Sequence, residues 1–470
     1  MITLADILEA LTQVRPVAPQ IISEAAVDSR QVIPSSLFIA IKGENVDGHN
    51  FVTEAFLNGA QVALIEQDLS SQFPTIDLRG GQFPSILPPF EEQFCILVPN
   101  TILALQTIAK FWRSKLNLKV IGITGSVGKS TTKELISEVL SQKYCTLKNI
   151  GNLNNEIGLP LTILRLGKNH QRAILEMGFY VPGEIGLLCD IAKPSIGVVT
   201  NVGTVHAERA GSQEIIANGK AELVESLPSD GTAILNYDDP WVRSMAEKTQ
   251  ANIFYYGLDP NAHLWADEIE GLGLQGIRFR LHFQNEQLHI RVPLIGRHSV
   301  HTVLRAAAVG LVDDLSWQEI IYGLQQGHSQ LRLAAVSSST GALILDDTYN
   351  ASPDSVMAAL NLLDELQGNK CAVLGDMLEL GPYEQQGHQM VGVRAAQVVN
   401  RLITVGEKAK IIAESANQAG LSLSAITSVP SVPDAIQVLL GTLGQKDVVL
   451  IKGSHGLHME QIVNALEVNS

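Results

Sequence analysis

Hydrophobic positions along the chain fall into short runs, and most runs are followed by polar or glycine residues and then by a segment with helical spacing. Short runs that are apolar throughout are typical of strands buried on both faces of a sheet. We interpret as strands the runs at residues 37–41, 62–65, 94–98, 119–123, 173–175, 196–200, 233–235, 342–345, 371–374, 402–405 and 448–451. Helical spacing follows at residues 134–140 and 300–311, and an alternating, strand-rich stretch covers residues 277–292. This alternation predicts an α/β fold with mostly parallel sheets flanked by helices.

The length of the chain predicts more than one domain. Its 470 residues are about three times the usual ~150 residues of a domain. We expect a small α/β domain over residues 1–99, a central domain with a mostly parallel sheet over residues 100–315, and a Rossmann-like, doubly wound domain over residues 316–470. In open parallel sheets, ligands bind at the carboxyl ends of strands. Asp346, Asp347, Asp376 and Lys452 follow such strands in the third domain.

One strand-to-helix junction carries the pattern of a phosphate-binding loop. The apolar residues 119–123 lead into Thr124-Gly-Ser-Val-Gly-Lys-Ser130, and a helical pattern follows. Glycines let backbone N–H groups turn toward phosphate oxygens, the helix N-terminus adds its positive end, Lys129 adds a full charge, and Ser130 is placed to bind Mg²⁺. The generic pattern has a glycine where this chain has Ile123, so the loop is a variant. The alternative interpretation is a tight turn with a surface lysine.

Two further strand ends in the central domain offer ligands for Mg²⁺. Glu176 follows the strand at residues 173–175, and His206 lies six residues after the strand at 196–200. A lone histidine after a strand is more often a hydrogen-bonded turn residue, and a lone glutamate is more often solvated. Their coincidence with the phosphate-binding loop favours the metal-binding interpretation. Lys220 lies in a helical segment and, judged alone, is typical of a surface lysine.

The composition excludes several classes of protein. Thirty-three basic against 48 acidic residues give a net charge of −15, and no Lys/Arg cluster provides a nucleic-acid footprint. No uninterrupted apolar run approaches the ~20 residues of a membrane helix, and residues 1–11 carry Asp6 and Glu9, so we expect neither a membrane span nor a signal peptide. Four cysteines lie far apart without metal-ligand spacing, which is typical of reduced thiols in a cytoplasmic protein.

Together these motifs resemble the Mur ligases of peptidoglycan synthesis, a family of three-domain, ATP-dependent amide-forming enzymes. The similar segments follow in the family's order at residues 124–130, 151–160, 176–178, 201–206 and 220–222. The family also lacks the first glycine of the generic loop, so Ile123 strengthens the resemblance.

The outer domains resemble the family members that join D-alanyl-D-alanine to UDP-N-acetylmuramoyl-tripeptide. Residues 345–355, 374–381 and 452–454 look like that type, and the motifs of the ligase that adds the third amino acid are absent from the sequence. Residues 28–30, 37–43, 47–49 and 59–60 resemble the uridine-nucleotide-binding domain that both ligases share.

The resemblance implies that a substrate carboxylate attacks the γ-phosphate of ATP and that the D-alanyl-D-alanine amine then displaces the phosphate. Catalytic roles are implied for Lys129, Glu176, His206 and Lys220, and two Mg²⁺ ions are implied at Ser130, Glu176, His206 and Lys220, with Lys220 as a carbamate. ATP contacts are implied for Gly125, Ser126, Val127, Gly128, Lys129, Ser130, Thr131, Asn155, His298, Arg332 and Asp347. Substrate contacts are implied for Ser29, Arg30, Lys42, Asp47, His49, Asn350 and Lys452. A monomer is implied as well.

The chain departs from the family at three positions. Ser299 and Thr302 stand where the family often has asparagines near the adenine, and His455 stands where an arginine is common. Two other functions remain open: a non-catalytic, nucleotide-dependent binding protein with the ligase architecture, and a ligase with another acceptor, such as the tripeptide-forming enzyme or a folate-polyglutamate ligase. The complete set of metal and phosphate residues argues against the first, and residues 347–350 argue against the second.

Overall fold

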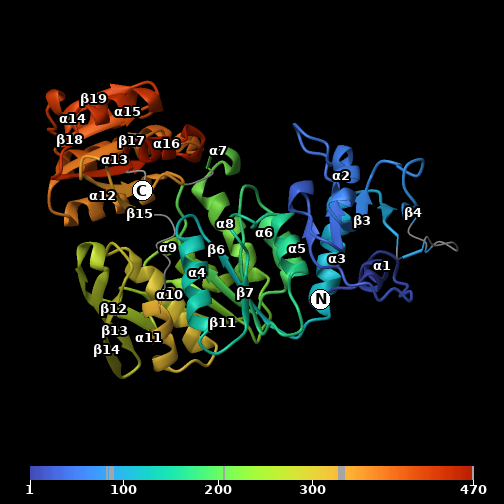
Figure 1. Cartoon of the computed structure of the whole chain (residues 1–470). Coiled ribbons are helices and arrows are strands. Elements are labelled where there is room, and N and C mark those ends of the chain that lie inside the picture. Colours follow the sequence, from blue (N-terminus) through green and yellow to red (C-terminus); the bar gives the residue numbers. More distant parts are fainter. Residues whose placement is uncertain (81–82, 84–88, 91, 205–206, 327–333, 468–470) are drawn as a thin grey trace.

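The computed structural model describes residues 1–80, 83, 89–90, 92–204, 207–326 and 334–467. It contains three α/β domains, each built around its own sheet. In Figure 1 the domains follow the order of the chain, from the blue N-terminal domain through the green and yellow central domain to the orange and red C-terminal domain. The predicted fold class, α/β with three domains, is confirmed.

The N-terminal domain has a five-stranded, fully parallel sheet in the order β1-β2-β3-β5-β4. Its strands are β1 (Ala25–Ala26), β2 (Ser36–Ile39), β3 (Ala60–Ile65), β4 (Thr75–Asp77) and β5 (Phe94–Leu97). Helices α1 (Leu4–Thr12) and α2 (Val52–Leu57) cover it. Short 3₁₀ turns at Ser29–Gln31 and Gly48–Phe51 hold two of the segments that the sequence assigned to substrate binding.

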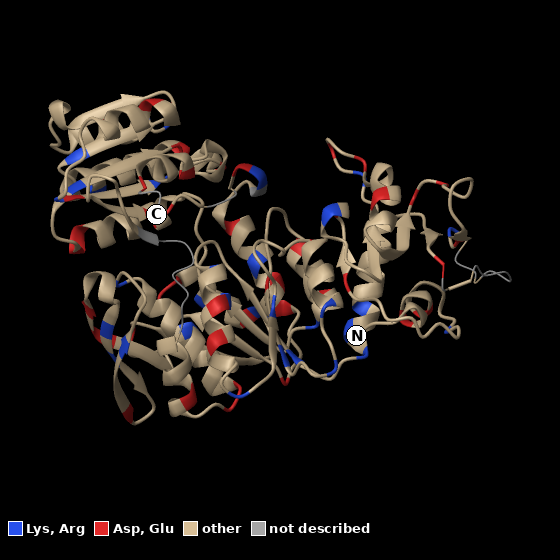
Figure 2. Cartoon of the chain, viewed as in Figure 1, with Lys and Arg blue, Asp and Glu red and all other residues tan. Residues whose placement is uncertain are grey.

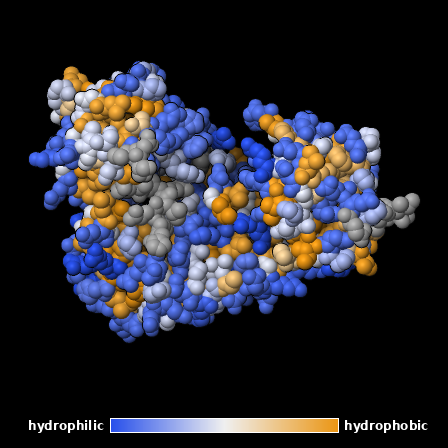
Figure 3. Space-filling view, viewed as in Figure 1, coloured by the Kyte–Doolittle hydropathy of each residue, from blue (hydrophilic) through white to orange (hydrophobic). Residues whose placement is uncertain are grey.

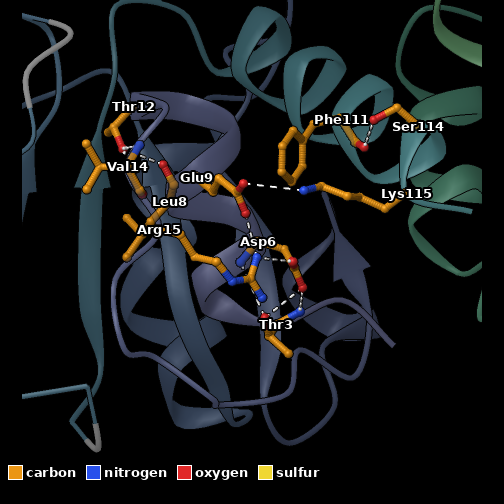
Figure 4. Close-up of polar contacts among 10 residues, drawn as sticks. All are labelled: Thr3, Asp6, Leu8, Glu9, Thr12, Val14, Arg15, Phe111, Ser114 and Lys115. Atoms are coloured by element: carbon orange, nitrogen blue, oxygen red, sulfur yellow. Dashed lines mark hydrogen bonds and ion pairs between the residues drawn. The ribbon is translucent and has the colours of Figure 1, made fainter.

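Helix α3 (Thr101–Ser114) joins the first two domains. The Asn100 side chain caps its start by accepting from the N–H of Leu103 at 2.8 Å. At its end Lys115 pairs with Glu9 of α1 at 3.3 Å, as Figure 4 shows. Its buried residues belong to one apolar core that runs from α1 into the central domain. The N-terminal domain is therefore packed onto the central domain through α3.

The central domain has a nine-stranded sheet in the order β14-β13-β12-β11-β10-β9-β6-β8-β7. Strands β6 to β12 pair in parallel, and β13 and β14 add an antiparallel edge. The strands are β6 (Lys119–Thr124), β7 (Thr146–Lys148), β8 (Arg172–Glu176), β9 (Ile196–Val199), β10 (Thr232–Asn236), β11 (Asn252–Gly257), β12 (Leu264–Gly271), β13 (Ile277–Phe283) and β14 (Glu286–Val292). The helices are α4 (Lys129–Leu140), α5 (Gly158–Leu164), α6 (Glu184–Ala192), α7 (Ala207–Ala210), α8 (Gln213–Glu225), α9 (Pro240–Ser244), α10 (Ser299–Val312) and α11 (Trp317–Gln326).

Successive residues of β6 belong to two different apolar cores, because side chains alternate between the faces of a sheet. Ile121 and Ile123 pack with α4, α10 and α11, whereas Val120 packs on the other face with α3, α5, α6 and α8. Helix α11 lies in the segment that the sequence assigned to the third domain, yet its apolar side packs against α4 and α10. This packing favours a domain boundary after Gln326 in place of residue 315.

The C-terminal domain has a six-stranded sheet in the order β15-β16-β20-β17-β18-β19, parallel except for β15. Two separate apolar cores cover its two faces, so the domain is doubly wound. The strands are β15 (Ala334–Ser337), β16 (Leu343–Asp346), β17 (Asn369–Gly375), β18 (Arg401–Val405), β19 (Ile426–Val429) and β20 (Asp447–Lys452). The helices are α12 (Pro353–Glu365), α13 (Glu384–Val398), α14 (Lys410–Gln418), α15 (Val432–Leu440) and α16 (Glu460–Leu466).

The central and C-terminal domains are in direct contact. Glu208 in α7 donates its backbone N–H to the carbonyl of Glu379 at 3.3 Å, and Arg297 pairs with Glu365 of α12 at 3.4 Å. On the face that Figure 3 shows, a gap separates the N-terminal domain from the C-terminal domain. Acidic and basic residues are interspersed over all three domains in Figure 2. None of the described helices combines the length and apolarity that a bilayer crossing requires.

Candidate active site

The phosphate-binding loop connects β6 to α4, where the sequence placed it. Gly125 has φ +143°, and a Cβ on this residue would lie 1.8 Å from the hydroxyl of Thr200. Gly128 has φ +81° and precedes the first residue of α4. Both positions therefore require glycine. The loop places the N-terminus of a twelve-residue helix at the carboxyl edge of the sheet, where helix N–H groups favour an anion.

Residues that follow β9 form hydrogen bonds with the phosphate-binding loop. Thr200 donates its hydroxyl to the carbonyl of Val127 at 2.7 Å, and Asn201 accepts the N–H of Val127 on its side-chain oxygen at 2.9 Å. The Asn201 carbonyl accepts the N–H of Ser126 at 3.0 Å, and the Ser126 hydroxyl accepts the N–H of Gly203 at 2.8 Å. These contacts fix the loop before a ligand arrives.

Lys129, the first residue of α4, folds its side chain back over the loop. Its Nζ donates to the carbonyl of Gly125 at 2.9 Å and to that of Ser126 at 3.3 Å. The ammonium group therefore lies over the loop whose N–H groups would face phosphate. Thr131 follows in the first turn of the same helix.

Glu176, the last residue of β8, is a buried carboxylate with neutral donors around it. It is 2% exposed, and its two oxygens accept from the hydroxyl of Ser130 at 2.6 Å and from the side-chain amide of Asn154 at 2.9 Å. Asn149 holds the backbone of Glu176 from both sides, because its amide donates to the Glu176 carbonyl and its oxygen accepts the Glu176 N–H. Ser130 and Glu176, each predicted to bind Mg²⁺, are thus in direct contact.

These oxygens fit a magnesium site. Mg²⁺ prefers oxygen ligands and commonly takes one or two from the protein, the rest coming from water and phosphates. The Ser130 hydroxyl and the Glu176 carboxylate supply that set beside the loop. No group of three or more His, Cys, Asp or Glu residues suited to a metal ion occurs within the described ranges. His206, the predicted third protein ligand, lies outside the described residues.

Lys220 on α8 is a buried lysine, not the surface residue that its local sequence suggests. It is 1% exposed, and its Nζ lies 4.9 Å from the centre of the Phe179 ring. Burial, together with the positive charge of Lys129, lowers the pKa of Lys220 well below its ordinary value. Its amine is therefore neutral, and hence nucleophilic, far more often than that of an exposed lysine.

The N-terminal end of α10 contributes two histidines. His301 lies 2.8 Å from a carboxylate oxygen of Asp238, a residue that follows β10. His298 is exposed at the start of α10, where its ring can reach a bound nucleotide.

Adjacent strands β16 and β20 bring Asp347, Asn350 and Lys452 together. Lys452, 2% exposed, pairs with a carboxylate oxygen of Asp347 at 2.7 Å and donates to the carbonyl of Asn350 at 2.8 Å. These three residues, all predicted to bind ATP or substrate, form one cluster at the carboxyl edge, as expected for parallel strands. Arg332, predicted to join them, lies outside the described residues.

A cleft of about 520 Å³ separates the central and C-terminal domains. The ends of β9 and β10 line one wall through Gly203 and Asp239, and the start of α12 lines the other through Asp354. Gly203, which lines the cleft, donates its N–H to the hydroxyl of the loop residue Ser126.

The candidates in the N-terminal domain form local contacts. Arg30 makes a two-point ion pair with Asp28, and Ser29 is buried in the same turn. Asp47 accepts from the N–H and the ring of His49, whose other ring nitrogen accepts the N–H of Glu66 at 2.9 Å. Since both ring nitrogens of His49 are occupied, this residue orients Asp47. Lys42 is exposed beside it.

Several residues that build the site had no role predicted from the sequence. Asn154 and Asn201 lie in the family-like segments 151–160 and 201–206, whereas Asn149 and Thr200 lie outside them. All four side chains are uncharged, so only the fold reveals their contacts. Asn155, predicted to contact ATP, is exposed and accepts the N–H of Gly158 at the start of α5.

Comparison with known proteins agrees with the geometry. The Mur ligase middle domain matches residues 123–310, the Mur ligase, glutamate ligase domain matches residues 331–455, and the Mur ligase family, catalytic domain matches residues 22–77. A UDP-N-acetylmuramoyl-tripeptide--D-alanyl-D-alanine ligase of Bacillus subtilis (strain 168) is 34% identical over 450 residues, which cover 95% of this chain and 93% of the relative.

Solved structures give the same result. MurF from Acinetobacter baumannii has a TM-score of 0.83 at 31% identity and covers 98% of this chain and 97% of its own. MurF ligase from Thermotoga maritima, solved in complex with ADP, has a TM-score of 0.77 at 25% identity and covers 94% of this chain and 96% of its own. The family models together span most of the sequence, and the chain belongs to the Mur ligase family.

Proposed function

We propose that the chain joins D-alanyl-D-alanine to UDP-N-acetylmuramoyl-tripeptide at the expense of ATP. A carboxylate oxygen of the tripeptide attacks the γ-phosphorus, ADP leaves, and an acyl phosphate forms. The dipeptide amine then attacks the acyl carbon, phosphate leaves, and the amine loses a proton. The products are the pentapeptide precursor, ADP and phosphate. The observation that carries this proposal is the Ser130–Glu176 contact beside a phosphate-binding loop, in a chain similar along its length to ligases of that name.

The first step must overcome charge repulsion. Two like unit charges 4 Å apart repel by about 4 kcal/mol at an effective dielectric constant of 20. Lys129 and the N-terminus of α4 supply positive charge at the phosphates. Bound Mg²⁺ at Ser130 and Glu176 would neutralise phosphate charge in addition. We propose a second ion near Glu176, Lys220 and His206.

Lys220 fits the role of a carbamate that faces the second ion. Carbamate formation requires a neutral amine that attacks CO₂, and the lowered pKa of Lys220 supplies one. A carbamate would place an anion at this buried position, which a divalent metal would stabilise.

The C-terminal domain provides the wall opposite the loop. Asp347, paired with Lys452, and Asn350 lie at its carboxyl edge, and we propose that this edge closes on the nucleotide and on the dipeptide. Closure excludes water, which would otherwise hydrolyse the acyl phosphate. A cytoplasmic location and a monomeric state stay predictions.

Acceptor competition tests the function. Phosphate release from ATP is measured with UDP-N-acetylmuramoyl-tripeptide and, in turn, D-alanyl-D-alanine, single amino acids, or glutamate with a folate acceptor. Release that requires D-alanyl-D-alanine and gives a pentapeptide by mass spectrometry is the expected result. Release with another acceptor identifies a ligase of different specificity, and the absence of release with every acceptor supports a binding protein.

A further inference from the structure

Arg305 is a buried cation beside the phosphate-binding loop. It lies on α10, which packs against α4, and is 5% exposed. A Cβ built on Gly128 would lie 3.2 Å from its Nη2 atom, so the guanidinium group borders the residue at which α4 begins. The proposed reaction assigns no role to this charge.

The contacts of Arg305 are all with neutral groups. Nη2 donates to the Thr302 hydroxyl at 2.8 Å, and Nη1 lies 3.4 Å from the Tyr256 hydroxyl. Among the residues that the structure describes, none accepts a hydrogen bond from its buried Nε. Across the described ranges, Arg305 forms no ion pair with a carboxylate. A buried guanidinium without a counter-ion is costly, because its charge has lost water without gaining a partner.

Tyr256 does not need the arginine. Its hydroxyl reaches the carbonyls of Val199 at 3.3 Å and Thr200 at 3.2 Å, so the tyrosine already has acceptors for its proton. A role limited to holding Tyr256 therefore leaves both the charge and the free Nε unexplained.

We propose that Arg305 binds a phosphate of the nucleotide through its guanidinium group, whose Nη2 atom borders Gly128. The N–H groups of a guanidinium group match the oxygens of a phosphate, and the group retains its charge when buried. The neighbouring N-terminus of α4 attracts the same anion. Arg305 would thus add a second cation to that of Lys129. This inference rests on the nucleotide site of the proposed function.

The test compares ligands that carry phosphate with a ligand that carries none. Dissociation constants for ADP, tripolyphosphate and adenosine are measured without tripeptide or acceptor on the wild type, Arg305→Met, Arg305→Lys and Arg291→Met. Arg291 lies on β14 and contacts Gln275. Arg291→Met therefore removes the same charge as Arg305→Met, but far from the loop. Each melting temperature is recorded with and without ligand, so that a less stable variant still gives a ligand-induced shift.

For Arg305→Met we expect about a ten- to hundredfold loss of affinity for ADP and tripolyphosphate, and unchanged affinity for adenosine. Arg305→Lys should lose less affinity for these two ligands, and Arg291→Met should lose none. Unchanged ADP affinity in Arg305→Met, or an equal loss for adenosine, overturns the proposal and leaves a structural role. If Arg305→Met does not fold, Arg305→Lys decides by the same comparison. A wild type that binds no ADP refutes the proposed function along with this inference.

Discussion

The hydroxyl of Ser130 donates to a carboxylate oxygen of Glu176 at 2.6 Å, although 45 residues separate the two in sequence. Ser130 comes from the first turn of α4 and Glu176 from the end of β8. Parallel pairing of β6 with β8 brings these two elements to one edge of the sheet. The contact joins the phosphate-binding helix to a buried carboxylate, and Mg²⁺ would displace this hydrogen bond when both oxygens turn to the metal.

Replacing Glu176 by Gln should remove metal-dependent catalysis. The amide keeps the size of the side chain and can still accept from Ser130, but it has lost the negative charge that holds a divalent ion. Since metal ions supply several kcal/mol of transition-state stabilisation in such reactions, we expect kcat to fall by about a hundredfold or more. Phosphate release is measured as Mg²⁺ is titrated.

ADP affinity in the presence of EDTA is the control for Glu176→Gln. It should not change, because the loop and Lys129 are intact. A variant with wild-type kcat at saturating Mg²⁺ would show that Glu176 is not a metal ligand.

Replacing Gly125 by Ala should prevent nucleotide binding. The added Cβ would overlap the Thr200 hydroxyl, and φ +143° is strained for alanine, at a cost of about 1 to 3 kcal/mol. Gly444→Ala is the matched control, since a Cβ there has no atom within 4 Å. ADP binding is measured by calorimetry for both variants. Tight ADP binding by Gly125→Ala would mean that this loop does not hold the phosphates.

Lys220→Ala should lose activity and regain part of it on addition of a short carboxylic acid. The free acid would occupy the space of the lysine side chain and present a carboxylate to the metal site in place of the carbamate. Intact-mass measurement of the wild type under CO₂ should show one added carboxyl group. Full activity of Lys220→Ala without added acid would disprove the role of this residue.

Stability should fall in mild acid because of His388. This histidine on α13 is fully buried, its Nε2 accepts the N–H of Met377, and its Nδ1 lies 2.7 Å from the carbonyl of Glu384. Burial lowers the pKa of His388 below its ordinary value of 6.5. The unfolded chain therefore binds a proton as the pH falls through 6.5, while the folded chain does not, and acid favours unfolding.

The contribution of His388 is at most about 1.4 kcal/mol per pH unit below pH 6.5. The free energy of unfolding is measured between pH 5 and 8 for the wild type and His388→Gln. The variant, which cannot titrate at this position, should show a shallower decline below pH 6.5. Equal slopes for both proteins would contradict the assignment.

The strongest sequence signals predicted the fold well, because buried parallel strands are continuous apolar runs. The runs at residues 119–123 and 448–451 lie in β6 and β20. Strands β7 and β19 went unpredicted because they are short and half exposed. β11 was missed as well, since it mixes polar and aromatic residues in its sequence.

The site was predictable where charge or glycine spacing marked it. Lys129 and Glu176 follow strands and carry charge, so their convergence could be expected. Arg305 had no such mark, because it lies within an apolar helix and its burial beside Gly128 depends on how α10 packs against α4. Lys220 was recognised only through family resemblance, since its local sequence gives no sign of burial.

Oxygen transfer from the tripeptide to phosphate tests the central claim most directly. UDP-N-acetylmuramoyl-tripeptide labelled with ¹⁸O in the reacting carboxylate is turned over with ATP and D-alanyl-D-alanine, and the released phosphate is analysed by mass spectrometry. The account predicts one ¹⁸O atom in the phosphate for each pentapeptide formed from a fully labelled carboxylate, because the acyl phosphate breaks at the acyl carbon. Unlabelled phosphate would contradict it, since the phosphoryl group would then have passed to water.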